Sequence, residues 1–79
     1  MKIGTVTRAV WSSRKASCLM GQTFLTVATP EGQIVAADQV GAGTGDRVLL
    51  AMGTVASRFC MEAPIDAAVV AILDPEEKK

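Results

Sequence analysis

Short runs of aliphatic and β-branched residues recur along the chain, and turn-forming residues separate them. Runs of this length and composition are typical of β-strands. Five of them are predicted strands: residues 1–11, 23–29, 33–38, 47–52 and 67–73. The last run is continuously apolar, which predicts a strand buried on both faces. Within the first run, Gly4 predicts either a bulge or a close approach of two backbones.

The segments between the predicted strands favour tight turns and loops. Pro30 presets φ for a turn and Gly32 accepts positive φ, so the second and third strands are expected to form a hairpin. The polar residues 12–22 predict a longer loop, from which Leu19 and Met20 are expected to fold back onto the strands. Five short strands in a chain of 79 residues indicate a small closed or nearly closed barrel, because closure removes exposed strand edges.

Helical structure is expected only as short turns. Thr54 can cap one turn over residues 55–61. Asp74 is a good N-cap and Pro75 suits the first helical position, so a second turn is expected to start there. The chain carries no internal repeat and no linker-like segment. We therefore expect residues 1–79 to form one mostly β domain, in which 75–79 are a short polar tail.

The composition favours an oligomer. A domain this small is marginal by itself and usually gains stability from disulfides, a metal ion or oligomerisation. Cys18 and Cys60 could form at most one bridge, and the chain has neither His nor a Cys-x-x-Cys pair for zinc. Apolar residues make up 49% of the chain and charged residues 20%, so apolar surface is expected to remain for contacts with other copies.

The charge balance argues against a nucleic-acid-binding protein. Eight basic residues balance eight acidic ones, whereas such proteins usually carry a basic excess. An OB-like module with bases stacked on Trp11 and Phe24 stays open as an alternative, since Arg14 and Lys15 are an adjacent basic pair. Trp11 is otherwise expected to pack in the core or in an interface.

The hydropathy pattern also bears on location. No run of 18 apolar residues appears, which gives no indication of a transmembrane helix. Lys2 leads into a strand-like pattern instead of the apolar core of a signal peptide. A cytoplasmic protein is expected.

No combination of residues indicates catalysis. Histidine, the commonest general base, is absent, and the cysteines have no such partner. Four aspartates stand beside turns or strand ends, where Asp commonly accepts hydrogen bonds from local backbone: Asp38, Asp46, Asp66 and Asp74. We expect no enzyme activity, no metal and no cofactor.

The segment Gly41-Ala42-Gly43-Thr44-Gly45 is unusually rich in glycine. A dinucleotide-binding loop would need a third glycine where Asp46 stands and a helix after it, but a strand is predicted there. Two other interpretations stay open from the residues alone. The loop can need positive φ, or several backbones can approach closely where any Cβ would clash.

Several segments together resemble the EutN/CcmL family of bacterial microcompartment vertex proteins. They are MKIGTV (1–6), RKASCLMG (14–21), VAADQVGAGTGDRVLL (35–50), GTVASR (53–58) and PIDAAVVAILD (64–74). The resemblance covers nearly the whole chain. It implies a five-stranded OB-like barrel and a homopentamer that performs no chemistry. Its implied role is structural, capping the vertices of a shell whose facets consist of hexameric shell proteins.

The resemblance also implies candidate site residues. The glycine-rich loop, from Gly41 to Gly45, would lie near the five-fold axis around a narrow pore. The family often has Glu-Trp where this chain has Asp46-Arg47, which makes both residues candidates for a subunit interface. From the residues alone, Asp66 has an alternative to binding local backbone: it can pair with Arg47 or Arg58 across an interface, which makes Asp66 and Arg58 candidates as well.

Overall fold

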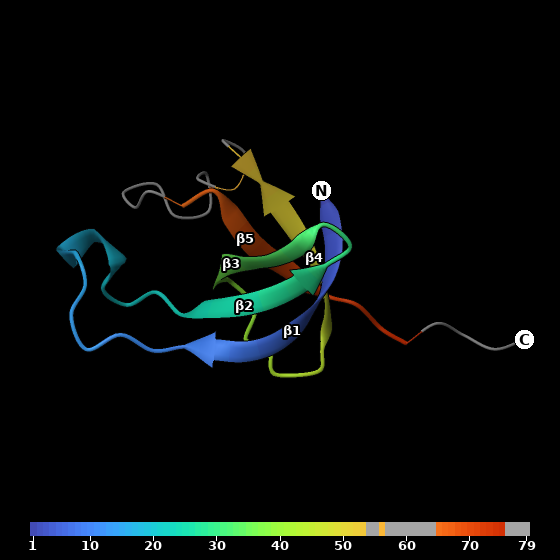
Figure 1. The fold of residues 1–79 in the computed structure, drawn as a ribbon, viewed down its shortest axis with the longest axis horizontal. Helices are drawn as coiled ribbons and strands as arrows, with labels where there is room; N and C mark the ends of the chain where they lie inside the picture. The colour runs from blue at the N-terminus through green and yellow to red at the C-terminus, as the bar shows by residue number, and fades with distance from the viewer. Residues whose placement is uncertain (54–55, 57–64, 76–79) are drawn as a thin grey trace, which may run out of the picture.

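The computed structural model describes residues 1–53, 56 and 65–75, and within them five strands close into a barrel (Figure 1). The strands are β1 (Lys2–Val10), β2 (Phe24–Thr29), β3 (Gly32–Asp38), β4 (Arg47–Met52) and β5 (Ala67–Ile72). Their order around the barrel is β1-β2-β3-β5-β4, and β4 pairs with β1 to close it. A 3-10 turn, η1 (Ser17–Leu19), lies between β1 and β2. The prediction of a mostly β, five-stranded barrel is confirmed.

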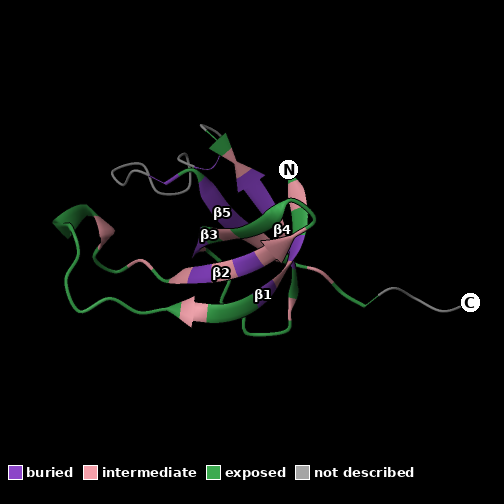
Figure 2. Cartoon of the chain, in the orientation of Figure 1, coloured by how far each residue is buried: buried purple, intermediate pink, exposed green. Residues whose placement is uncertain are grey.

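Alternation along the strands decides which side chains fill the barrel. Leu25 and Val27 of β2 are buried, whereas the residues flanking them are only half-buried. Successive side chains of a strand point to opposite faces, so these two occupy the interior together. Figure 2 shows the buried positions on the strands. The main core cluster consists of small and medium aliphatic residues: Val6, Leu25, Val27, Ala36, Val48, Leu50, Ala67 and Val69.

The irregularity predicted around Gly4 is a close approach, and the bulge of β1 lies elsewhere. A Cβ on Gly4 would stand 2.5 Å from Val27 Cγ1 and 2.7 Å from the Ala28 carbonyl oxygen. The register of β1 against β2 instead shifts between Val6 and Arg8, which leaves Thr7 as the extra residue. A bulge of this kind reverses the alternation of the strand that carries it.

The predicted hairpin of β2 and β3 is confirmed. Thr29 pairs with Gly32, so Pro30 and Glu31 form the turn, and Gly32 has φ of 129°. The other edge of β3 meets β5 in parallel, with Ala37 opposite Ala68 and Asp38 opposite Val69. This short parallel contact completes the barrel wall.

Two packing predictions hold only in part. β5 is buried on both faces over Ala67–Val69, but Ile72 at its end is 43% exposed. The side chains at the start of β5 are therefore shielded from water, whereas those at its end are exposed. In the loop before β2, Leu19 is half-buried as expected, whereas Met20 is 64% exposed and does not fold back onto the barrel.

The two predicted helical turns lie largely outside the described residues. Asp74 and Pro75 have no regular secondary structure, and the rest of that predicted turn, residues 76–79, lies outside the described residues. Most of the turn predicted over 55–61 also lies outside them, but the residues described there, Gly53 and Ala56, are helical.

Candidate functional site

Asp38, at the end of β3, organises the start of the glycine-rich loop. Its Oδ1 accepts hydrogen bonds from the backbone N–H groups of Val40 and Gly41, each at 3.1 Å. Its Oδ2 accepts a third from Ala42 at 3.0 Å. A carboxylate that binds three successive N–H groups fixes the course of the chain, because charge-assisted bonds of this kind are stronger than neutral ones.

Asp46 holds the other end of the loop. Its Oδ2 accepts the N–H of Gly43 at 2.8 Å. Backbone bonds then attach the loop to β1: the Gly45 N–H donates to the Val6 carbonyl at 2.8 Å, and the Val6 N–H donates to the Asp46 carbonyl at 2.9 Å. The prediction that aspartates at these turns bind local backbone is confirmed for Asp38 and Asp46.

The conformation of the loop explains two of its glycines. Gly41 and Gly45 have φ of 81° and 92°, a region that side chains with a Cβ rarely adopt. Gly43 has no positive φ, and its missing Cβ would meet only Asp46 Oδ2 at 3.9 Å. The barrel itself therefore gives no reason for a glycine at 43. Its placement near a five-fold axis stays a prediction.

The loop is ill-suited to binding phosphate. A phosphate-binding loop presents free backbone N–H groups to the anion. Here the N–H groups of Val40, Gly41, Ala42 and Gly43 already donate to two carboxylates. The exposed part of the loop carries only the short side chain of Thr44, so it offers a compact, uncharged rim.

The structure separates the candidate interface residues instead of gathering them. Arg47 is exposed and begins β4, where its carbonyl accepts the Leu73 N–H at 2.7 Å. Asp66 is exposed and lies beyond the other end of β4, where its carbonyl accepts the Gly53 N–H at 2.7 Å. Any pairing of Arg47 with Asp66 would thus join two copies of the chain. Arg58 lies outside the described residues.

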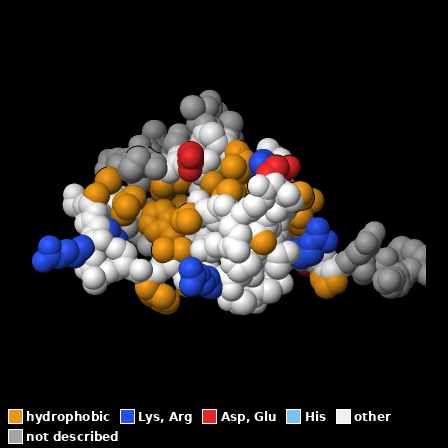
Figure 3. Space-filling model, viewed as in Figure 1, with side chains coloured by type: hydrophobic (Ala, Val, Ile, Leu, Met, Phe, Trp, Pro, Cys, Tyr) orange, Lys and Arg blue, Asp and Glu red, His pale blue; other side chains and the backbone are white. Residues whose placement is uncertain are grey.

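An apolar groove lies beside the β1–β2 loop, and the aromatic residues of the nucleic-acid-binding alternative, Trp11 and Phe24, both line it. It has a volume of about 430 Å³, and its lining includes Val10, Trp11, Phe24 and Val35. Trp11 is 88% exposed, which excludes the core position in the single chain, and its expected place in an interface stays a prediction. Figure 3 shows hydrophobic side chains gathered between this loop and the barrel.

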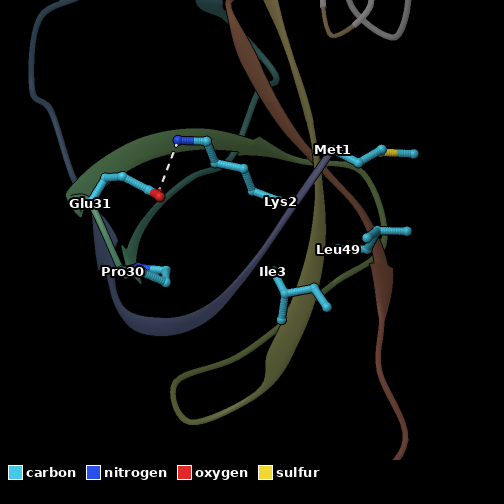
Figure 4. A pocket seen from close by; sticks show the side chains of 6 residues that line it. All are labelled: Met1, Lys2, Ile3, Pro30, Glu31 and Leu49. Atoms are coloured by element: carbon cyan, nitrogen blue, oxygen red, sulfur yellow. Dashed lines mark hydrogen bonds and ion pairs between the residues drawn. The ribbon is translucent and has the colours of Figure 1, made fainter.

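A second apolar pocket lies at the start of β1. It has a volume of about 420 Å³ and is lined by Met1, Ile3 and Leu49, with the Lys2–Glu31 ion pair beside them (Figure 4). Lys2 Nζ donates to Glu31 Oε1 at 3.1 Å, and this hydrogen bond, with the charge of Lys2, lowers the pKa of Glu31. A lowered pKa means that the pair favours folding above the ordinary pKa of Glu, and that this contribution disappears as the pH falls through the lowered value.

The described part of the chain contains no cluster of acidic and thiol groups that could bind a metal ion. Residues 1–53, 56 and 65–75 contain no group of three or more potential metal ligands. Cys18 is exposed with a free thiol, and Cys60 is outside the described residues. None of the helical segments described is long and apolar enough to span a membrane.

Comparisons with known proteins identify close relatives over nearly the whole chain. The carboxysome shell vertex protein CcmL of Synechococcus elongatus is 43% identical over 94% of this chain and 84% of its own length. The microcompartment shell vertex protein PduN of Salmonella typhimurium is 41% identical over 94% of this chain and 96% of its own.

Solved structures have the same fold. The GrpN pentameric microcompartment shell protein from Rhodospirillum rubrum superimposes with a TM-score of 0.86 at 35% identity, over the full length of both chains. The family model described as ethanolamine utilisation protein EutN/carboxysome matches residues 1–74. The chain therefore belongs to the EutN/CcmL family.

Proposed function

We propose that this chain is a structural protein of a bacterial microcompartment shell, in which five copies form a ring that closes a vertex. The observation that carries the proposal is the full-length likeness to a pentameric microcompartment shell protein, with a TM-score of 0.86 and 35% identity. Two relatives of more than 40% identity are named as shell vertex proteins. The proposed role is geometric, and it requires no enzymatic step.

The surface of the single chain supports assembly into a ring. A cyclic ring uses two different patches, because one face of each subunit meets another face of the next. The barrel has two separate apolar surfaces of this kind, one around Trp11 and one around Ile3. Both residues are exposed, at 88% and 46%. Apolar surface of this extent usually marks a contact site.

The glycine-rich loop is proposed to surround the five-fold axis. Five copies can approach closely there because the loop presents backbone and small side chains, and because Asp38 and Asp46 hold it in one conformation before assembly. This arrangement gives Gly43 a role that the isolated barrel does not.

A pair of substitutions at Gly43 tests the position of the loop. Gly43→Ala should leave the barrel folded, since the added Cβ meets nothing closer than 3.9 Å within the chain, and it is the control for folding. Gly43→Trp should crowd the axis and break the ring into smaller species, which size-exclusion chromatography with light scattering would measure. A normal ring carrying Gly43→Trp would remove the loop from the axis.

The shell partners are proposed to be hexameric facet proteins of the same microcompartment in the cytoplasm. Six-fold tiles form flat sheets, and a five-fold unit introduces the curvature that closes them. Electron microscopy of shells assembled from facet proteins should show closed polyhedra when this chain is present. Without it, open or elongated assemblies are expected. Closed polyhedra of the same shape in both preparations would argue against the vertex role.

A second candidate function is single-stranded nucleic-acid binding. One observation favours it: Trp11, Arg14, Lys15 and Phe24 all line one groove. Aromatic side chains with basic residues beside them can stack bases and contact phosphates. The zero net charge counts against it. Titration with a labelled single-stranded oligonucleotide at low salt measures this binding directly. This candidate function requires binding that saturates and that weakens as salt is added.

A further inference from the structure

The groove around Trp11 has the properties of a protein contact surface. We call the space lined by Val10, Trp11, Phe24 and Val35 the Trp11 groove. Tryptophan is enriched among the residues that dominate binding energies, and this one is 88% exposed in the single chain. Val10 and Val35 are also exposed, at 38% and 52%. A water-exposed aromatic and two exposed valines in one groove favour an occupant with an apolar side chain.

The groove also has a basic side. Arg14 and Lys15 line it and are exposed. Among the described residues, Lys2 forms a salt bridge with Glu31, whereas neither Arg14 nor Lys15 forms one. An occupant with acidic groups next to its apolar ones would therefore satisfy both halves of the groove. Such pairing of complementary charges across an interface gives specificity and register.

The C-terminal segment 72–75 has the matching character. Ile72 is 43% exposed and Leu73 half-buried, and the exposed Asp74 follows them directly. The last hydrogen bond that ties the segment to the barrel runs from the Leu73 N–H to the Arg47 carbonyl. The sequence continues with two glutamates and then two lysines. Apolar residues followed by a carboxylate are the pattern that the groove requires.

The two surfaces cannot meet within one chain. Figure 1 shows the β1–β2 loop and the C-terminal segment leaving the barrel on opposite sides. The longest dimension of the molecule is 48 Å. Residues 73–75, which follow the end of β5, would span only about 10 Å when fully extended, so they cannot reach back to the groove of their own chain. A groove at one end and a complementary segment at the other can join only different copies, and they do so head to tail.

We propose that the C-terminal segment of each copy docks in the Trp11 groove of the next copy. Leu73 packs against the aromatic and valine side chains, and Asp74 faces Arg14 and Lys15. The contact is heterologous, so it closes a ring or continues into a chain of subunits. The proposal rests on the proposed function, since it assigns one contact of the ring.

Disulfide trapping between two differently tagged chains tests this contact. One chain carries Ser12→Cys, in the lining of the groove, and the other carries Asp74→Cys. Both carry Cys18→Ser and Cys60→Ser. Mixing and mild oxidation should give a covalent pair of the two tagged chains on a non-reducing gel. The matched control replaces Ser12→Cys with Pro30→Cys, in the turn at the far end of β2, and should give no such pair.

Side-chain substitutions provide a second measurement. Trp11→Ala should weaken association by about 30-fold or more, as expected for a dominant interface residue. Asp74→Lys alone, and Arg14→Glu with Lys15→Glu, should each weaken it as well. Combining all three charge reversals should restore part of the loss, because the signs are complementary again. These substitutions change exposed residues, so the barrel is expected to fold in each variant.

The outcomes separate the contact from the ring. A ring of five that forms no trapped pair and ignores the charge reversals would overturn the contact and leave the proposed function standing. A monomer at every concentration would overturn both. Saturable binding of a labelled single strand that is lost in Trp11→Ala would assign the groove to nucleic acid, and would also overturn the contact.

Discussion

A missing side chain matters at Gly4 for a different reason than at the loop glycines. Gly4 lies in β1, where the neighbouring strand β2 passes so close that a Cβ would overlap Val27 and the Ala28 carbonyl. The loop glycines at 41 and 45 are instead required by positive φ. Packing restricts Gly4, whereas backbone conformation restricts Gly41 and Gly45. A substitution at Gly4 should therefore disturb the barrel, and one at Gly41 or Gly45 should disturb the loop.

Gly4→Ala should destabilise the barrel by about 1–3 kcal/mol, the usual cost of overpacking a close contact. The clash involves backbone as well as a side chain, so small rotations cannot relieve it. Urea unfolding at one fixed protein concentration measures the change, since assembly makes stability concentration-dependent. Gly43→Ala is the matched control and should change little. Equal midpoints for the two variants would contradict the close approach.

Asp38 should be the residue whose loss affects the glycine-rich loop most. Asp38→Ala removes the acceptor of three backbone N–H groups and should cost about 1–2 kcal/mol, because exposed donors can regain water. NMR of the variant should show shifted amide signals for Val40, Gly41 and Ala42, while β1 and β2 keep theirs. Unchanged loop signals would contradict the anchoring role.

Residue-level prediction succeeded where the cause is local. An aspartate beside a glycine-rich turn indicates backbone capping, and Asp38 and Asp46 do cap the loop. It failed at Met20, which is exposed, and for Trp11 it did not decide between the core and an interface, of which exposure excludes the core. The direction of a side chain after a bulge depends on which residue is the extra one, and the pattern of β1 did not reveal that Thr7 is that residue.

At the level of elements, the strands and their closure into a barrel were predictable, but among the strand pairings only the hairpin was. For β2 to β5, the strand ends predicted from apolar runs and turn residues lie within one or two residues of the observed ends. The hairpin of β2 and β3 follows from its two-residue turn. The parallel contact of β3 with β5 joins segments about 30 residues apart, and no pattern within either strand indicates it.

The barrel should open first where β3 meets β5. β2 and β3 pair along their whole lengths, whereas the parallel contact joins two residue pairs and continues through the Gln39 N–H to the Val69 carbonyl at 3.1 Å. Few hydrogen bonds mean a low free energy of local opening. Hydrogen exchange should therefore be faster at Gln39 than at the centre of β2. The reverse order would contradict a weak seam there.

At the scale of the whole molecule, composition and surface agree. A chain with 49% apolar residues and zero net charge leaves Met1, Ile3, Trp11, Met20 and Val35 largely exposed as a single barrel. Composition alone predicted an oligomer, whereas the proposed number of copies rests on the likeness to pentameric shell proteins. How the proposed copies sit against one another depends on which surface of one barrel meets which surface of the next. The hydropathy pattern shows that apolar surface exists, but it does not show which two surfaces meet.

The native mass of the purified protein in solution tests the central claim most directly. Light scattering or native mass spectrometry, over a range of protein concentrations, should give a mass of five times the 8.2 kDa chain. That result would match the proposed ring, in which the apolar surfaces of one barrel are covered by the next. A mass of one chain at every concentration would contradict the vertex role and leave those surfaces in need of another partner.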